Sequence, residues 1–378
     1  MAMTKEKKGL SVSWAEKGGY EVRIVEDAFD AGNPELADAL KHVTNSDEPH
    51  VMLVADANVV HRTEGLGTKI GRYVQTHGIK LAGSPVVLGG GEKVKADDMD
   101  GVKKLASSAV NAKVGASDVM LVIGGGTILD VAGYVARQVR GGLKLVRMPT
   151  TPAAMVDAAY AECAAIDLNG VKDALRVPCR PDAVVVDTAF AGTVLDGVWR
   201  GGLGEIVRHA AVSDASLLKK VAKNAEALKA RDMAATVEAM RSSVESRVKK
   251  GATDFAEWSA LRLEAMSGYK LPHGYAVPIA ICIDCAYSVE KGLMKESDQE
   301  MICKTLADCG ALDGLAHSHH ILSQADGILF GLDAWRLSTG ASSIVVPAGI
   351  GKSVVEENPD RAAFRKVIKE FLAVSTGA

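Results

Sequence analysis

A run of three glycines is the first feature of this chain that suggests chemistry. Gly124, Gly125 and Gly126 end the apolar segment DVMLVIGGG (118–126) and precede an amphipathic stretch. Because glycine lacks a Cβ, backbone N–H groups here can approach a pyrophosphate closely, with the N-terminus of the next helix facing it. Asp130 follows in the first turn of that expected helix. The dinucleotide fingerprint G-x-G-x-x-G is absent, so the run by itself fits a phosphate site and a ligand-free βα turn equally well.

Two further segments place polar residues where an apolar run ends. Asp56 and Asn58 follow the apolar part of VMLVADANVV (51–60), where the sugar and base of a nucleotide could be held. Glu92 and Lys95 lie in GGGEKVK (89–95), after another short apolar run. Open α/β sheets bind ligands at the carboxyl ends of their strands, so three such ends together favour a nucleotide site.

Short β-branched runs alternate with helical stretches in the first half of the chain. This order predicts a parallel sheet with helices on both faces. The expected strands lie within the segments 51–60, 84–93, 118–126, 143–151 and 182–190.

After about residue 190 the pattern changes to long helices, which we expect within 214–250 and 274–310. We therefore predict two domains, 1–190 and 191–378. The cleft between two domains is a common place for a small-molecule site.

Composition limits the classes of function. The chain has 378 residues, 48% of them hydrophobic, and a formal net charge of −3 with both signs mixed, so neither nucleic acid nor a membrane is expected as a partner. No run approaches ~18 uninterrupted apolar residues, which argues against a transmembrane helix. The start, MAMTKEKKGLSVSW, lacks the apolar core of a secretory signal, and six dispersed cysteines fit reduced thiols. We expect a cytoplasmic protein.

The chain contains seven motifs in this order: VADANVV, GGGEKVK, GGGTILDVAGYVA, RMPTTPAAMVDAA, DAVVVDTAF, GGLGEIVRHA and LPHGYAVPIAI. Taken together, these motifs resemble those of the sugar-phosphate cyclases, whose best-known member is 3-dehydroquinate synthase. Two other segments, DFAEWSALRLEAMSGYKLPHGYAVPIAICID and GLDAWRLSTG, are closer to the dehydroquinate-synthase-like proteins of bacterial secondary-metabolite operons. The resemblance implies a Rossmann-like NAD domain, an all-helical metal-binding domain and a homodimer.

The resemblance also implies a reaction in which the cofactor is restored. NAD⁺ oxidises a secondary alcohol of a seven-carbon sugar phosphate, phosphate is eliminated, the hydride is returned, and an intramolecular aldol step closes a ring. A divalent metal holds the alcohol oxygens and polarises the carbonyl.

By the same resemblance, the cofactor positions are intact, and Asp157 stands where the family keeps an acid near the substrate and the nicotinamide. The cofactor positions are Asp56, Asn58, Glu92, Lys95, Gly124, Gly125, Gly126, Asp130, Thr150 and Thr151.

The implied metal site is altered. Glu205 fits the first family ligand and His273 the third, but the second, a histidine in the family, falls in FAEW and becomes Glu257. A Glu/Glu/His set would bind zinc, or a harder ion such as manganese, iron(II) or cobalt. The alternative is that Glu257 points to solvent and no metal is bound.

The implied substrate positions differ most from the family. Cys163 replaces a lysine, Asp173 follows Lys172 in place of asparagine, and Leu261 replaces a possible proton carrier. We expect catalytic roles for Asp157, Lys172, Arg208 and Lys250, and substrate contacts from Arg140, Asp173, Asp254 and Arg336. The substrate is then expected to be a sugar phosphate other than the usual dehydroquinate precursor.

Two other functions stay open: an NAD-dependent alcohol or glycerol dehydrogenase with a metal, and a nucleotide-binding descendant that has lost catalysis. Three other motifs have simpler explanations than ligand binding. CIDC (282–285) fits a buried helix face, HSHH (317–320) an exposed connection, and GIGK (349–352) a turn, while His209 is either part of the site or structural.

Overall fold

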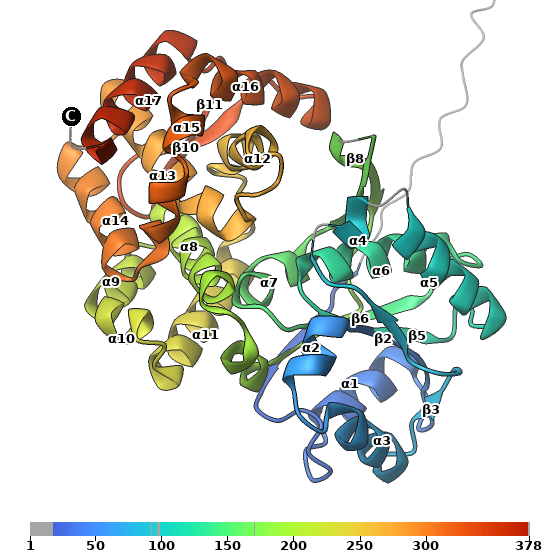
Figure 1. Ribbon diagram of the computed structural model, residues 1–378. Coiled ribbons are helices and arrows are strands. Elements are labelled where there is room, and N and C mark those ends of the chain that lie inside the picture. The colour runs from blue at the N-terminus through green and yellow to red at the C-terminus, as the bar shows by residue number, and fades with distance from the viewer. Residues whose placement is uncertain (1–17, 92, 97–98, 170, 377–378) are drawn as a thin grey trace, which may run out of the picture.

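The computed structural model describes residues 18–91, 93–96, 99–169 and 171–376. Its first half is built on a seven-stranded parallel sheet in the order β1-β9-β6-β5-β2-β3, with β4 also paired to β2 (Figure 1). The strands are β1 (Glu21–Val25), β2 (His50–Asp56), β3 (Lys80–Leu81), β4 (Val86–Leu88), β5 (Val119–Gly124), β6 (Lys144–Pro149) and β9 (Ala183–Asp187). The predicted parallel sheet is confirmed.

Helices follow most of these strands and cover the sheet. Strands β5 and β9 are buried along their whole length, as expected of apolar strands covered on both faces. The helices of this half are α1 (Glu35–Thr44), α2 (Ala57–Arg62), α3 (Leu66–Thr76), α4 (Lys93–Ala96), α5 (Asp100–Asn111), α6 (Gly126–Gln138) and α7 (Pro152–Val156), with the 3₁₀ turns η1 (Ala158–Tyr160) and η2 (Thr188–Thr193). An antiparallel hairpin of β7 (Cys163–Leu168) and β8 (Val171–Pro178), which the sequence patterns did not predict, follows η1.

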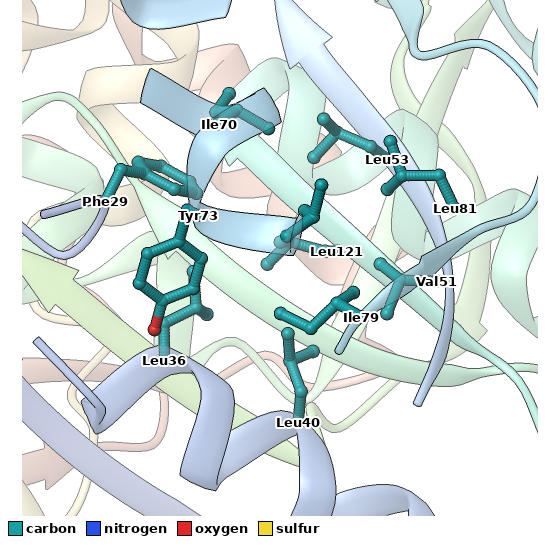
Figure 2. A pocket seen from close by; sticks show the side chains of 11 residues that line it. Phe29, Leu36, Leu40, Val51, Leu53, Ile70, Tyr73, Ile79, Leu81 and Leu121 are labelled. Carbon is teal, nitrogen blue, oxygen red and sulfur yellow. The ribbon is translucent and has the colours of Figure 1, made fainter. Parts of the chain in front are cut away.

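The core between the sheet and helices α1 and α3 is closely packed. Figure 2 shows the apolar side chains around a cavity of about 10 Å³, too small and too apolar to hold a ligand. The Tyr73 hydroxyl is the polar exception: it donates to the Asn33 carbonyl (3.0 Å) and accepts from the Ala37 amide (2.9 Å). This part of the core is therefore not a ligand site.

The second half is helical, as predicted, except for one hairpin of β10 (Ile344–Pro347) and β11 (Ser353–Glu356), so "all-helical" is too strict a description. Its helices are α8 (Asp196–Ser213), α9 (Ala215–Lys223), α10 (Ala225–Lys229), α11 (Met233–Lys250), α12 (Glu257–Met266), α13 (His273–Glu290), α14 (Glu296–Asp308), η3 (Ala311–His317), α15 (His319–Leu322), α16 (Ala325–Thr339) and α17 (Arg361–Thr376). Figure 1 shows α7 and α8 where the two halves meet. Among the described residues, no helix combines the length and apolarity needed to cross a bilayer.

A buried aspartate, Asp284, lies within the core of this helical half. Its side chain is fully buried on α13 and accepts hydrogen bonds from Trp258 Nε1 (3.1 Å) and Ser259 Oγ (3.3 Å). Burial raises the pKa of Asp284 to about 8, because the two hydrogen bonds compensate only part of the lost hydration.

We expect the Asp284→Asn variant to be more stable than wild type above neutral pH. The pKa of Asp284 is higher in the folded state than its ordinary value of 3.8, so its contribution to stability is present below about pH 4 and is lost as pH rises toward 8. Thermal unfolding midpoints are measured for both proteins at pH 5, 7 and 9. The midpoint of wild type should fall relative to that of the variant as the pH rises. The exposed Asp47→Asn serves as the control, and a constant difference across this range would contradict the prediction.

Candidate active site

Polar groups of the first half gather at one edge of the sheet. Since β2, β4 and β5 are parallel neighbours, their carboxyl ends lie at the same edge. The buried Asp56 ends β2 and caps α2, where its Oδ1 accepts from the Asn58 amide (2.8 Å). The loop after β4 passes very close to these two residues: a Cβ placed on Gly90 would lie 2.3 Å from Asn58 Nδ2 and 2.4 Å from Asp56 Oδ1.

The glycine run lies at the same edge. Gly124 ends β5, Gly125 is the N-cap of α6, and Gly126 begins that helix. The first amides of a helix have no partner within it, and with the helix dipole they form an anion site. A Cβ on Gly125 would lie 3.1 Å from Thr151 Cγ2, so the run must stay small for the loop after β6 to pack beside it. Thr150, at the end of β6, has a buried hydroxyl without a hydrogen-bond partner, a position that a bound ligand would satisfy.

Two predicted cofactor residues, Lys95 and Asp130, are paired with each other. Lys95 Nζ lies 2.8 Å from Asp130 Oδ2 and 2.5 Å from Asp173 Oδ1. Burial by itself would lower the pKa of Lys95, but the two carboxylates outweigh it and the pKa is raised. Asp173, which we expected to contact substrate, lies on β8, and Lys95 holds its carboxylate at the cofactor edge. Glu92 lies outside the described residues.

A glycine crossing brings α8 and α13 together in the helical half. A Cβ on Gly201 would lie 2.8 Å from Gly274 Cα, and one on Gly274 would lie 2.5 Å from Gly201 Cα, so any side chain at either position would separate the helices. Glu205 follows Gly201 by one turn on α8, and His273 precedes Gly274 at the start of α13. The crossing therefore places these two predicted ligands side by side.

Glu205 and His273 form the first part of a charged cluster. Glu205 Oε1 lies 3.2 Å from His273 Nε2, and Glu264 Oε1 lies 2.7 Å from His273 Nδ1. Lys172, on β8, reaches Glu264 Oε2 at 2.6 Å. Burial opposes protonation of His273, but Glu264 and Glu205 outweigh it, so its pKa is raised.

Arg208 forms the second part of the cluster. Its guanidinium contacts Glu205 Oε2 (2.8 Å), Asp157 Oδ2 (3.2 Å) and Glu257 Oε2. Arg247 NH1, on α11, donates to Asp157 Oδ1 at 2.5 Å. Burial would raise the pKa of Asp157, but the two guanidinium groups outweigh it and lower that pKa. Asp157 belongs to the first half and both arginines to the second, so this cluster joins the halves.

The structure does not bring every predicted site residue into this cluster. Lys250 donates to the Ser213 carbonyl (2.6 Å) at the C-terminal end of α8. Arg140 is exposed in the turn between α6 and β6, at the sheet edge opposite the glycine run. Asp254 is exposed one turn before α12, and Arg336 is exposed on α16.

The predicted metal trio is only partly assembled. Glu205 and His273 meet, whereas Glu257 is held by Arg208. Within the part of the chain that the structure describes, no three His, Cys, Asp or Glu side chains are grouped as ligands of one ion.

Three residues of this region were not predicted: Arg247, Glu264 and Arg147. Arg147 lies in the buried strand β6 and donates to the carbonyls of Ala159 (3.1 Å), Ala161 (2.8 Å) and Cys179 (2.9 Å). It thereby fixes the segment that follows Asp157. An arginine within the apolar run LKLVRM was a signal for it, because charged residues are rarely fully buried without partners.

Three of the four remaining features, CIDC, GIGK and His209, have structural roles. Cys282 and Cys285 are buried on α13 as free thiols, and GIGK forms the turn between β10 and β11. His209 is buried with Nε2 3.0 Å from Ser246 Oγ, and burial lowers its pKa to about 4. Of HSHH, the side chains of His317 and His319 lie outside the described residues.

Known proteins are similar to this chain in both sequence and fold. The 3-dehydroquinate synthase N-terminal profile matches residues 85–199 and the C-terminal profile residues 202–313, which together span more than half of the chain. The 3-dehydroquinate synthase of Ruegeria pomeroyi is 29% identical over 286 residues, covering 72% of this chain and 77% of that protein.

Two solved structures have a similar fold. A 2-epi-5-epi-valiolone synthase from Streptomyces hygroscopicus subsp. jinggangensis, with NAD⁺ and Zn²⁺ bound, aligns with a TM-score of 0.82 at 21% identity, over 97% of this chain and 99% of that one. A 2-deoxy-scyllo-inosose synthase complexed with carbaglucose-6-phosphate, NAD⁺ and Co²⁺ gives 0.72 at 16% identity, over 93% and 96%.

Proposed function

Because this chain belongs to the 3-dehydroquinate synthase family, we propose that it is an NAD- and divalent-metal-dependent sugar-phosphate cyclase. The observation that carries the proposal is the position of Asp157. This carboxylate belongs to the cofactor half, yet it binds Arg208 and Arg247 of the helical half, beside the Glu205–His273 pair. We also propose that the enzyme is a cytoplasmic homodimer, as the resemblance implies.

The sheet edge supports NAD as the cofactor. The N-terminus of α6 offers amides for the pyrophosphate, and Asp56 and Asn58 offer polar groups for the adenosine. The unpartnered hydroxyl of Thr150 gives a donor at the end of β6. The two solved neighbours named above hold NAD⁺, which supports the same cofactor here.

The Glu205–His273 pair fits a divalent metal. Two ligands of a tetrahedral zinc ion with bonds of about 2.0–2.1 Å lie roughly 3.3 Å apart, close to the 3.2 Å between Glu205 Oε1 and His273 Nε2. Glu264 binds the other ring nitrogen, which is how carboxylates orient metal-bound histidines. Glu257 becomes the third protein ligand if it leaves Arg208. Zinc suits this set, and cobalt, manganese or iron(II) also match its two carboxylates.

The residues of the cluster have distinct tasks in the proposed reaction. When bound, NAD⁺ supplies reversible oxidation of the substrate alcohol and the metal ion supplies Lewis-acid polarisation. Asp157 is ionised, and its lowered pKa makes it a hydrogen-bond acceptor that orients a substrate hydroxyl. Lys172 and Arg247 are two cations of this cluster that a phosphate group can use.

We expect Gly90→Ala to weaken NAD⁺ binding at least about tenfold. Its Cβ would collide with Asp56 and Asn58, so one of these side chains must leave its place at the cofactor edge. Gly89→Ala is the matched control, because a Cβ there meets nothing within 4 Å. Fluorescence titration with NADH measures both variants, and equal affinities would contradict this placement of the cofactor.

The proposed reaction is tested by phosphate release. The purified protein is incubated with NAD⁺, Zn²⁺ or Co²⁺, and a panel of heptulose and heptulosonate phosphates, while free phosphate and absorbance at the reduced-nicotinamide band are followed. A cyclase releases phosphate without net formation of NADH. Steady accumulation of NADH with alcohols would instead favour the dehydrogenase, and neither signal with any panel member would contradict both enzymes.

A further inference from the structure

Arg208 contacts two of the three side chains of the predicted metal-binding trio, Glu205 and Glu257. Its side chain is only 4% exposed, and its two terminal nitrogens contact carboxylates from three different segments: Glu205 on α8, Glu257 on α12 and Asp157 after α7. Two of these three carboxylates are the acidic ligands expected from the sequence.

Arg208 pairs with carboxylates that a metal ion would also need as ligands. Glu205 Oε2 and Glu257 Oε2 both face the guanidinium, and with these contacts in place the described side chains do not include Glu257 as a third ligand beside Glu205 and His273. A guanidinium and a divalent cation also repel each other, most strongly where both lie beside buried side chains such as Arg208 and Glu205. Arg208 and a bound metal therefore require the same carboxylates.

We propose that Arg208 is an internal competitor of the metal ion, which lowers the affinity of this chain for divalent cations and must leave Glu257 when the ion binds. This inference rests on the proposed function. It distinguishes Arg208 from Arg247, which contacts Asp157 but neither of the two acidic metal ligands among the contacts described.

Removing the guanidinium tests this competition directly. We expect Arg208→Met to bind Co²⁺ roughly 10- to 100-fold more tightly than wild type, because the ion no longer displaces the contact with Glu257 and no longer meets a neighbouring buried positive charge. Arg208→Lys should gain roughly three- to tenfold, since a single ammonium cannot hold both carboxylates in the same way. Co²⁺ affinity is measured by competition with a chromophoric chelator at fixed pH, and circular dichroism checks folding.

Arg247→Met is the matched control, because it removes another largely buried positive charge, with a side chain only 10% exposed, from the same cluster. Its Co²⁺ affinity should stay within about threefold of wild type, because Arg247 contacts neither acidic ligand among the described residues and acts on the ion only by electrostatic repulsion at a distance. Equal gains in Arg208→Met and Arg247→Met would overturn direct competition, and so would an unchanged or weaker affinity in Arg208→Met. If Arg208→Met does not fold, Arg208→Lys decides the outcome in the same way.

NAD⁺ binding to the same preparations separates the two proposals. Normal NAD⁺ binding with no gain in Co²⁺ affinity on changing Arg208 overturns the competition and leaves the proposed function standing. A wild-type chain that binds neither NAD⁺ nor Co²⁺ overturns the proposed function. If the Arg208 variants also fail to bind Co²⁺, the competition is overturned as well.

Discussion

Replacing Glu205 with glutamine is expected to lower Co²⁺ affinity at least roughly 100-fold and to abolish phosphate release. The variant replaces the carboxylate beside His273 Nε2 with a neutral amide, which is a weaker ligand for a divalent ion. It also leaves Arg208 with one carboxylate fewer in a buried cluster. Chelator competition measures the first effect, and the phosphate assay measures the second with a substrate that the wild type accepts.

Glu238→Gln is the control for this variant. Glu238 is exposed on α11 and pairs with Lys220 at the surface, 3.0 Å apart, so the same change of charge should leave both measurements unchanged. Metal affinity within a fewfold of wild type in Glu205→Gln would show that this carboxylate is not a ligand. The metal part of the proposed function would then fail.

Replacing Arg147 with methionine is expected to cost about 3–5 kcal/mol of unfolding free energy, because carbonyls that lose their donor cost about 1–3 kcal/mol each. The variant retains an apolar stem but removes the donors to three carbonyls, those of Ala159 and Cys179, which are buried, and that of Ala161, which is partly buried. These carbonyls flank hairpin β7–β8, which carries Lys172 and Asp173, so we also expect activity to fall. Urea unfolding followed by circular dichroism measures the loss.

Arg137→Met is the matched control for this second prediction. Arg137 lies at the surface end of α6 with 30% of its side chain exposed, and it donates to the Arg180 carbonyl. Surface contacts of this kind contribute about 0–1 kcal/mol, so the loss should be correspondingly small. A similar loss in both variants would mean that Arg147 acts only as a spacer within β6.

The parallel sheet could be predicted because β-branched runs and helical stretches alternate along the first half of the chain. The strands β4, β5, β6 and β9 lie within the expected segments, and β2 begins one residue before its segment, since buried parallel strands are continuous apolar runs. Hairpin β7–β8 was missed although residues 169–170 read Asn-Gly, a strong hairpin signal, and Asn169 has the left-handed φ of 52°. Hairpin β10–β11 was missed because it is short and surrounded by helices.

The candidate site could be predicted only in part, because sequence reveals residue types and not their partners. Glycine and aspartate at strand ends pointed to the cofactor edge, since strand order fixes where those ends meet. The contact of Lys95 with Asp173 depends on how hairpin β7–β8 folds back, and no pattern in the chain shows that. Likewise, Arg208 meets Asp157 and Glu257 only because α7, α8 and α12 converge.

Anomalous scattering from crystals grown with NAD⁺ and Co²⁺ tests most directly whether the two halves form one catalytic site. We predict a single cobalt peak bonded to Glu205 Oε1 and His273 Nε2, with Glu257 turned toward it and the nicotinamide facing it from the glycine edge of the sheet. A cobalt peak elsewhere, or NAD⁺ bound away from Gly124–Gly126, would contradict this account.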